Sequence, residues 1–234
     1  MSPHSHLVIG GSAGIGYAYA FRRAVERGTI TLVARNPAGL RRAAARLRRA
    51  GAADVEVFSC DIADPEARGA MMRGLEGRKF GSVLLSGPSP PFGPLSSVDG
   101  VQIHTASEIA LVYPLELARW ALRGGVVKGG RFVVISSSAA VEPLCEHEFF
   151  LSALLRRSLE TMLGCLEDAF VRSAVRLEVW RPRLVLTHAA RRYARSLGAN
   201  RPADVHRRLR QHFGFAPVAP AKFVRLCEEE HESL

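Results

Sequence analysis

The stretch Leu7-Val-Ile-Gly10-Gly-Ser-Ala-Gly14-Ile-Gly16 joins a short apolar run to a helical pattern through a turn that is rich in glycine. Its glycines follow the spacing G-x-x-x-G-x-G. Because glycine has no side chain, backbone N–H groups and the N-terminus of the helix can approach a pyrophosphate closely. Such a turn between a first strand and a first helix predicts a dinucleotide site, with an ordinary tight turn as the alternative. The expected phosphate-binding residues are Gly10, Ser12, Ala13, Gly14, Ile15 and Gly16.

Short apolar runs and helical patterns alternate along the rest of the chain. Strands are expected at residues 7–9, 29–34, 55–60, 82–85, 131–135 and 176–179. Helices are expected at residues 15–27, 38–50 and 152–173. The strand runs have few polar interruptions, as is typical of parallel strands covered on both faces. Repeated strand–helix–strand units predict an α/β, Rossmann-like, doubly wound parallel sheet with helices on both faces.

Length and composition fit one domain. The 234 residues, of which 47% are hydrophobic and 23% charged, suffice for one large core. No internal repeat or low-complexity linker divides the chain. Residues 1–234 are therefore expected to form a single nucleotide-binding domain.

The end of the second expected strand bears on the choice of cofactor. Leu32-Val-Ala-Arg35-Asn36 places an arginine where an acidic residue would hydrogen-bond a free 2′-hydroxyl of the adenosine ribose. Arg35 can instead pair with a 2′-phosphate, which favours NADP(H) over NAD, and a solvated arginine is the alternative. Asp61-Ile62, after the third strand, is expected to bracket the adenine. Gly87-Pro88, after the fourth, leaves room beside the nicotinamide ribose.

Together with Ile135-Ser-Ser-Ser138 and Pro182-Arg-Leu-Val-Leu-Thr187, these motifs resemble those of the short-chain dehydrogenase/reductase family over nearly the whole chain. The resemblance implies a Rossmann-like fold and NAD(P)-dependent hydride transfer at a carbonyl or a secondary alcohol. It adds Pro182 and Thr187 to the cofactor-binding residues. It also implies a homodimer or homotetramer built on the helix at residues 152–173.

The catalytic half departs from the family pattern. Members use a tyrosine acid, a lysine four residues later, a serine about thirteen residues earlier and an asparagine. Ser137 matches the serine, and Ser136 and Ser138 are alternatives under a shift of one residue. Phe150 stands in the place of the tyrosine and has no proton to give to an alkoxide. The places of the lysine and the asparagine are taken by Leu154 and Ala110.

A shift of two residues aligns Ser152-x-x-x-Arg156 with the missing pair, which resembles a divergent branch of the family. The segment Ser86-Gly-Pro-Ser-Pro-Pro-Phe-Gly-Pro94 also looks like that branch. Ser152 and Arg156 then become catalytic candidates beside Ser137. A serine hydroxyl is a poorer acid than a phenol, and an arginine does not release its proton.

A histidine offers a second substitute for the missing acid. His147 lies in Cys145-Glu-His-Glu148, next to the expected mouth of the active site, and can act as general acid or base near neutral pH. Glu146 or Glu148 would orient its ring, and a polar surface turn is the alternative. His188 follows Thr187 and either faces the nicotinamide or the substrate, or has only a structural role.

The charge of +10 comes almost entirely from arginine, because only Lys79, Lys128 and Lys222 are lysines. A bias toward one basic residue does not indicate a nucleic-acid partner. Residues 188–215 form the expected variable substrate lobe, and their arginines suit a small-molecule substrate that is acidic or bound to a carrier. Solvated helix faces explain the same arginines.

Further features concern compartment and completeness of the sheet. The four cysteines show neither the spacing of a disulfide framework nor that of a metal site, so we expect no metal and a reduced, cytoplasmic location. The N-terminal stretch lacks an apolar signal core, so we expect no membrane partner. Residues 216–224 resemble the turn and helix before the family's last strand. The strand itself is expected to be absent, which puts the tetramer contact built on it in doubt.

Three functions remain open from the sequence. The first is an NADPH-dependent, ketoreductase-like oxidoreductase with an atypical catalytic centre. The second is a non-redox enzyme on the same scaffold, such as a cyclase, isomerase, dehydratase or lyase. The third is a catalytically silent partner protein. An altered catalytic group on a retained scaffold favours a substrate from specialised rather than central metabolism.

Overall fold

A parallel sheet of six strands forms the centre of the computed structural model, which describes residues 4–91, 93–141 and 148–232. Along the sheet the strands follow the order β3-β2-β1-β4-β5-β6. The strands are β1 (Ser5–Ile9), β2 (Thr29–Ala34), β3 (Asp54–Ser59), β4 (Phe80–Leu85), β5 (Val126–Ile135) and β6 (Arg176–Trp180). All six expected strands and the doubly wound α/β fold are confirmed, and β6 forms one edge of the sheet as far as the chain is described.

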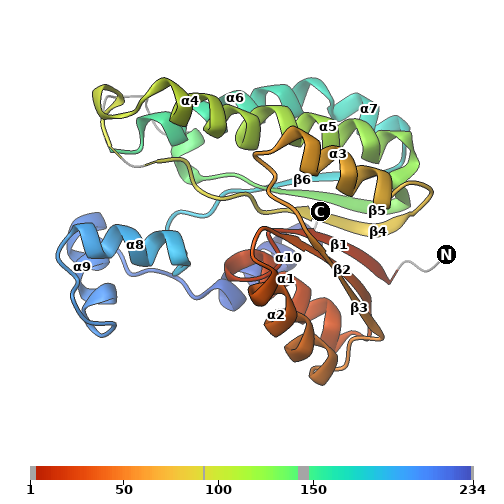
Figure 1. The fold of residues 1–234 in the computed structure, drawn as a ribbon, viewed down its shortest axis with the longest axis horizontal. Helices are drawn as coiled ribbons and strands as arrows, with labels where there is room; N and C mark the ends of the chain where they lie inside the picture. The colour runs from red at the N-terminus through yellow and green to blue at the C-terminus, as the bar shows by residue number, and fades with distance from the viewer. Residues whose placement is uncertain (1–3, 92, 142–147, 233–234) are drawn as a thin grey trace.

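Helices cover both faces of the sheet (Figure 1). One face carries α1 (Gly14–Val25), α2 (Pro37–Arg49) and α10 (Pro220–Glu232). The other carries α3 (Pro65–Gly74), α4 (Gly100–Ser107), α5 (Tyr113–Trp120), α6 (Phe150–Cys165) and α7 (Glu167–Arg172). Short 3-10 turns at Leu95–Ser97 and Ser138–Ala140 and π-helical turns at Glu108–Val112 and Ala121–Gly125 complete the described helical segments on this side.

The single helix expected at residues 152–173 is wrong, because the chain forms two helices there. α6 ends at Cys165, and Leu166, with φ −97° and ψ −4°, is both the C-cap of α6 and the N-cap of α7. The helix-weakening Gly164 precedes the break, and the acidic Glu167 and Asp168 follow it in the first turn of α7. Acidic residues stabilise a helix N-terminus, so a new start is favourable at this point although the apolar pattern continues.

Two apolar clusters fill the spaces on either side of the sheet. Leu7, Val83 and Phe132 point to the α3–α7 side, and Val8, Leu84 and Val133 point to the α1–α2–α10 side. This alternation follows from the two-residue period of a strand. α10 is fixed to α1 by Glu228, whose side chain is 0% exposed and pairs with Arg22 and Arg23.

The expected variable lobe contains α8 (His188–Ser196) and α9 (Asp204–Phe213), which stand beyond the carboxyl ends of the strands (Figure 1). The two helices share a small core that includes Tyr193, Ala194 and Leu209. A parallel bridge between Val185 and Val218 ties the base of the lobe together. No helix in the described ranges is both long and apolar enough to cross a membrane.

Candidate active site

The glycine turn lies between the carboxyl ends of β1 and β4, where the order of the strands reverses. Open α/β sheets bind their ligands in the crevice at this point. Gly10 N donates to Val33 O over 2.8 Å, and Ser86 N donates to Ile9 O over 3.0 Å. Backbone hydrogen bonds to both neighbouring strands therefore hold the turn at the crevice.

Close backbone contacts explain two of the glycines. Gly10 has φ +78°, and a Cβ there would lie 1.9 Å from Ser86 O. A Cβ on Gly16 would lie 2.5 Å from Gly10 O. Both distances are far inside van der Waals contact, so a side chain at either position would displace the backbone of the crevice.

The N-terminus of α1 is open to an anion. Its N-cap residue, Ala13, makes no side-chain hydrogen bond, and the first turn holds no acidic residue. The N–H groups at the start of the helix therefore have no competing side-chain acceptor. Ile15 is buried in the core, so this residue would bind phosphate through its backbone. The cradle fits the pyrophosphate of a dinucleotide.

Thr187 is brought to the glycine turn from the far end of the chain. Gly14 has φ +62°, and a Cβ there would lie 3.5 Å from Thr187 Cγ2. Thr187 Oγ1 accepts from Ala190 N over 3.4 Å and caps α8. Pro182 O accepts from Ser138 N over 3.0 Å, so Pro182 lies beside the turn that follows β5.

Arg35 and Asp61 also meet, as their places at the ends of β2 and β3 lead one to expect. Arg35 Nη1 lies 3.5 Å from Asp61 Oδ2, and the Arg35 side chain is 80% exposed. An exposed pair of this kind is weak and can open toward a ligand. Asn36 Oδ1 accepts from Gly39 N over 3.1 Å, so this side chain caps α2.

The remaining predicted cofactor residues lie around the same crevice in different environments. Ile62 is buried in the apolar core, and its carbonyl accepts from Arg68 Nη1 over 2.8 Å. Gly87 is half-buried, and a Cβ there would lie 3.4 Å from Ile109 Cγ2 in the π-helical turn. Pro88 is exposed. The π-helical turn also holds the buried Ala110.

The serines after β5 differ in what their hydroxyl groups contact. Ser136 is buried, and its hydroxyl donates to Glu160 Oε1. Ser137 Oγ accepts from Ala139 N over 3.3 Å and caps the short turn that follows. The Ser137 hydroxyl can still donate its own proton to a substrate oxygen. This geometry favours Ser137 over Ser136 as the residue that holds a carbonyl.

Three polar residues share one face of α6 at a spacing of four: Ser152, Arg156 and Glu160. Arg156 Nη1 donates to Ile135 O over 2.8 Å at the end of β5. Glu160 accepts from Ser136 and, over 2.8 Å, from Arg181 Nε. Since the crevice end of α6 is its N-terminal end, Ser152 lies one turn beyond Arg156 toward the crevice.

Arg156 is a buried cation. The residue is 8% exposed, and no carboxylate oxygen in the described part of the chain lies within 4.0 Å of its guanidinium. Burial lowers the pKa of Arg156 to about 10, and the nearby Glu160 carboxylate opposes that shift. The group therefore stays charged at neutral pH. Within the described ranges its acceptor is the Ile135 carbonyl, which leaves further N–H donors for an oxyanion.

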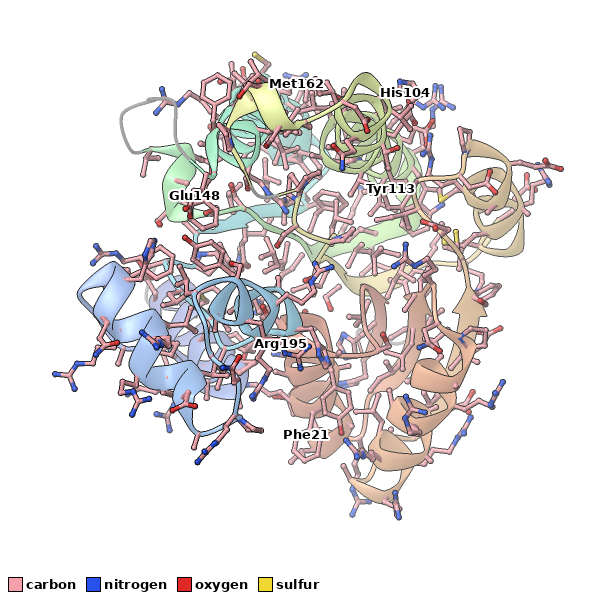
Figure 2. All side chains as sticks on the ribbon, turned by 60° about the vertical axis from the view of Figure 1, so that its left-hand side comes forward. Phe21, His104, Tyr113, Glu148, Met162 and Arg195 are labelled. Carbon is pink, nitrogen blue, oxygen red and sulfur yellow. The ribbon has the colours of Figure 1, made fainter. Side chains whose placement is uncertain are left out.

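His147, the second candidate for the missing acid, belongs to residues 142–147 and so lies outside the described residues. Glu148 follows that segment, at the start of α6 and next to the lobe (Figure 2). Its Oε2 accepts from the Tyr193 hydroxyl, which is also 2.8 Å from His212 Nε2. Burial and the Glu148 carboxylate raise the pKa of Tyr193.

Sequence reasoning missed several residues of this site: Glu160, Arg181, Tyr193 and His212. Glu160 had a usable signal, because it continues the four-residue spacing of Ser152 and Arg156 on one helix face. Tyr193 and His212 had none, because Glu148 is 45 residues before Tyr193 and their contact depends on how the lobe packs.

A family model described as short chain dehydrogenase matches residues 5–194. No curated protein matches the sequence significantly. Solved structures do match. L-Sorbose reductase from Gluconobacter frateurii, complexed with NADPH and L-sorbose, has a TM-score of 0.83 and 20% identity, and the match covers 95% of this chain and 88% of that one.

Two further solved structures have similar scores. A short-chain dehydrogenase from Sphingobium yanoikuyae in complex with NADPH has a TM-score of 0.81 at 20% identity, over 98% of this chain and 84% of that one. A 3-oxoacyl (acyl-carrier-protein) reductase from Agrobacterium tumefaciens with NADP bound has a TM-score of 0.80 at 20% identity, over 95% and 85%. At this identity the likeness to solved structures shows the fold alone.

Proposed function

The chain belongs to the short-chain dehydrogenase family, and from that premise we propose that it is an NADPH-dependent oxidoreductase with an atypical catalytic centre. The substrate would be a carbonyl or hydroxyl compound of specialised metabolism. The observation that carries the proposal is the glycine turn, whose contacts leave no space for a side chain at Gly10 or Gly16 and whose helix N-terminus has no side-chain cap.

The choice of NADPH is supported by charge at the adenosine end. Arg35 is exposed, and among the described residues its guanidinium forms an ion pair only with Asp61, which is a weak one, so it is available to a 2′-phosphate. Asp61 is then free to face the adenosine. The similar L-sorbose reductase and Sphingobium dehydrogenase were both solved with NADPH.

Three side chains of this protein would act on the substrate oxygen. Ser137 donates a hydrogen bond from its hydroxyl to the carbonyl oxygen, and Ser152 approaches from the first turn of α6. Arg156 stabilises the negative charge that develops on the oxygen, because its buried positive charge has no carboxylate neighbour within 4.0 Å in the described ranges. When bound, the nicotinamide supplies or takes up a hydride.

The proton for the alkoxide has to come from another group, because an arginine does not release its proton and a serine hydroxyl is a weak acid. His147 is the proposed donor, either directly or through water. An imidazole with its ordinary pKa gains and loses a proton near neutral pH, and this property of histidine suits proton transfer in both directions. Glu148 would not orient it through Oε2, since that atom is taken by Tyr193.

The lobe supports a substrate with negative charge, acidic or carried on a carrier. α8 holds Arg191, Arg192 and Arg195 and no acidic residue. The similar 3-oxoacyl reductase from Agrobacterium acts, by its name, on a carrier-bound acyl group. Solvated arginines on a helix face would look the same, so the substrate panel below includes neutral ketones.

The test is to measure binding of NADPH and NADH and then the oxidation of NADPH with neutral, acidic and carrier-bound ketones. We expect preferential NADPH binding and turnover with at least one ketone. Ser137→Ala should lower turnover and keep NADPH affinity, and Ser158→Ala, on the exposed face of α6, should change neither. Tight NADPH binding without turnover of any ketone would contradict the proposed reaction.

A non-redox reaction is the second candidate, and Arg156 is the observation that favours it. A buried cation stabilises an enolate or alkoxide without itself donating a proton, which suits an isomerase, cyclase, dehydratase or lyase. Conversion of a substrate at constant oxidation state, unchanged when NADPH is removed, would support this candidate. Strict dependence on NADPH oxidation would exclude it.

We also propose a homodimer or homotetramer. Val101, Val112 and Leu154 are exposed apolar residues on or beside α4, α5 and α6, on one side of the sheet. Light scattering on the purified chain should give a mass of two or four subunits. Replacement of Val112 and Leu154 by glutamate should return the mass to that of one chain.

A further inference from the structure

Arg68 is a buried cation in the first half of α3, and the residue is 2% exposed. Its guanidinium donates three hydrogen bonds in three directions. Nη1 donates to Ile62 O over 2.8 Å, Nη2 to Glu108 Oε2 over 2.7 Å and Nε to Glu116 Oε2 over 3.1 Å. These acceptors belong to the segment after β3, to the π-helical turn between α4 and α5, and to α5 itself. One side chain therefore joins three separate parts of the chain.

The π-helical turn brings the two carboxylates to the same side of their helical segment. Tyr113 N donates to Glu108 O, five residues earlier, which is the hydrogen bond of a π-helix. Pro114 has no N–H to donate to the carbonyl four residues before it, so a regular α-helix is interrupted at this point. In a regular α-helix Glu116 would be rotated by roughly 80° from Glu108, and one extra residue in the turn reduces this angle to about 20°. A single guanidinium can therefore bind both carboxylates.

The same π-helical turn also contacts the crevice and α6. A Cβ on Gly87 would lie 3.4 Å from Ile109 Cγ2, so Ile109 lies next to the segment expected beside the nicotinamide ribose. Ala110 belongs to a small buried cluster with Leu151 and Leu155 of α6. α6 is the helix that carries two of the candidate catalytic side chains. A shift of the π-helical turn would therefore move both the nicotinamide side of the crevice and the start of α6.

The charge of Arg68 is needed to keep the π-helical turn where it is. The side chains of Arg68 and Glu108 are 3% and 16% exposed, so this ion pair is largely shielded from water. The Arg68 guanidinium also lies 5.8 Å from the centre of the Tyr113 ring, at the end of the π-helical turn. Loss of one partner leaves the other charge buried and uncompensated. Without the arginine, Glu108 has to turn toward water, and the backbone of its turn has to move with it.

We propose that Arg68 is a positioning residue that holds the π-helical turn in place relative to the adenosine end of the crevice. Its bond to Ile62 O fixes the segment expected to bracket the adenine. Its bond to Glu108 fixes the turn that contacts the nicotinamide side and α6. This inference rests on the proposed function, because that function assigns the two places to the two ends of NADPH.

Calorimetry with NADPH and with 2′-phospho-ADP-ribose, which lacks the nicotinamide, tests the proposal. Glu108→Met cuts the link to the π-helical turn and leaves Arg68 bonded to Glu116 and Ile62. We expect NADPH binding to weaken about fivefold to tenfold and binding of the fragment to change by less than about twofold.

Variants of the arginine should give a different pattern. Arg68→Met should weaken the binding of both nucleotides, because the bond to Ile62 is lost as well. Arg68→Lys keeps the charge without the planar fork and should recover part of the loss. The matched control is Arg73→Met, at an exposed arginine of the same helix, which should change neither affinity. Equal losses for NADPH and the fragment in Glu108→Met would overturn the proposal.

Hydrogen exchange of the ligand-free chain provides a measurement that needs no cofactor. Amides of residues 108–112 should exchange at least about fivefold faster in Glu108→Met than in the wild type, and Arg73→Met should leave them unchanged. Equal exchange in Glu108→Met and the wild type would overturn the proposal. If the wild type bound neither nucleotide, the proposed function would fail, and the exchange rates would still decide whether Arg68 holds the π-helical turn in place.

Discussion

The two halves of the crevice differ in the groups that line them: one is lined by backbone atoms and the other by side chains. The cofactor half, from β1 to β4, is formed mostly by backbone atoms. Its shape requires glycine, because a Cβ at Gly10 or Gly16 would lie only 1.9 or 2.5 Å from a backbone oxygen. The catalytic half, from β5 to α6, is made of side chains. Ser136, Ser137, Arg156 and Glu160 shape it through hydrogen bonds, with a buried charge at the centre.

We propose that this difference underlies the departure from the family pattern that the sequence predicts for the catalytic half. A backbone cradle tolerates almost no substitution, because any side chain moves the main chain. In a site formed by side chains, one residue can be replaced by another as long as the buried hydrogen-bond donors and charges keep their partners. Arg156 has its carbonyl partner at Ile135, so a charge is retained in this half without a lysine.

The largest effect should come from Gly10→Ala. Its Cβ would overlap Ser86 O, and φ +78° is strained for alanine, so the turn has to move out of the crevice. We expect NADPH binding to be lost, measured by calorimetry. The control is Gly164→Ala, in α6 with open space around it, which should keep binding and raise stability by roughly 0.5–1 kcal/mol. Normal NADPH affinity in Gly10→Ala would disprove the backbone argument.

Arg156→Met should separate the two halves. The methionine fills the buried space without a charge, so we expect kcat/KM to fall roughly 100-fold, as for loss of one oxyanion donor, while NADPH affinity stays within about threefold. Steady-state kinetics and calorimetry give the two values. Arg156→Lys keeps a charge and should recover part of the rate. A similar loss of NADPH affinity and rate in Arg156→Met would assign the residue to the cofactor half.

How much could be predicted from the sequence differs between the halves for the same reason. The glycine turn and the six strands depend on local pattern, so spacing and apolar runs were enough. The pairing of Arg35 with Asp61 follows from parallel strands whose ends share one edge. The break after Cys165 was missed because the apolar pattern continues through it, and only the acidic start of α7 marks a new helix.

The contacts of the catalytic half needed the folded chain. Glu160 reaches Ser136 because α6 packs along the end of β5, which no local pattern shows. Tyr193 reaches Glu148 because the lobe folds back on the start of α6. A side chain that acts through a partner far away in the sequence has no characteristic spacing. The spacing of Ser152 and Arg156 therefore suggested them as candidates, and no pattern pointed to the residues around them.

The stability of the fold should depend on pH through His6, which lies below the cofactor half. His6 is buried in β1, and its Nδ1 lies 2.8 Å from Ser82 Oγ. Burial, with Arg23, His4 and Arg131 nearby, lowers its pKa to about 3. The unfolded chain therefore takes up a proton at His6 near pH 6.5, the usual pKa of histidine, whereas the folded chain does so only near pH 3. The stability that the neutral ring contributes is fully present above about pH 6.5, and the free energy of unfolding falls by roughly 1.4 kcal/mol per pH unit as the pH drops from there toward 3.

His6→Gln removes this proton uptake and should flatten the fall in stability between pH 6 and pH 4, measured by denaturant unfolding. The matched control is His104→Gln, at an exposed histidine, which should leave the pH profile as it is in the wild type. Equal profiles for His6→Gln and the wild type would show that His6 is already protonated in the folded chain.

The smallest effect should come from Tyr193→Phe, which cuts the hydrogen bonds that tie the lobe to the start of α6. The ring keeps its packing against Phe149 and Phe213, so only the hydroxyl is lost. Glu148 is exposed and regains water, which limits the loss in unfolding free energy to about 1 kcal/mol.

Once a substrate is known, its KM should rise a few-fold in Tyr193→Phe with kcat nearly unchanged, because the lobe would position the substrate and leave the reacting groups of α6 in place. Ser196→Ala, which removes a hydroxyl from the same helix away from Glu148, serves as the control. A drop in kcat in Tyr193→Phe alone would mean that this phenol takes part in proton transfer, and the catalytic half would then contain its own tyrosine, supplied by the lobe.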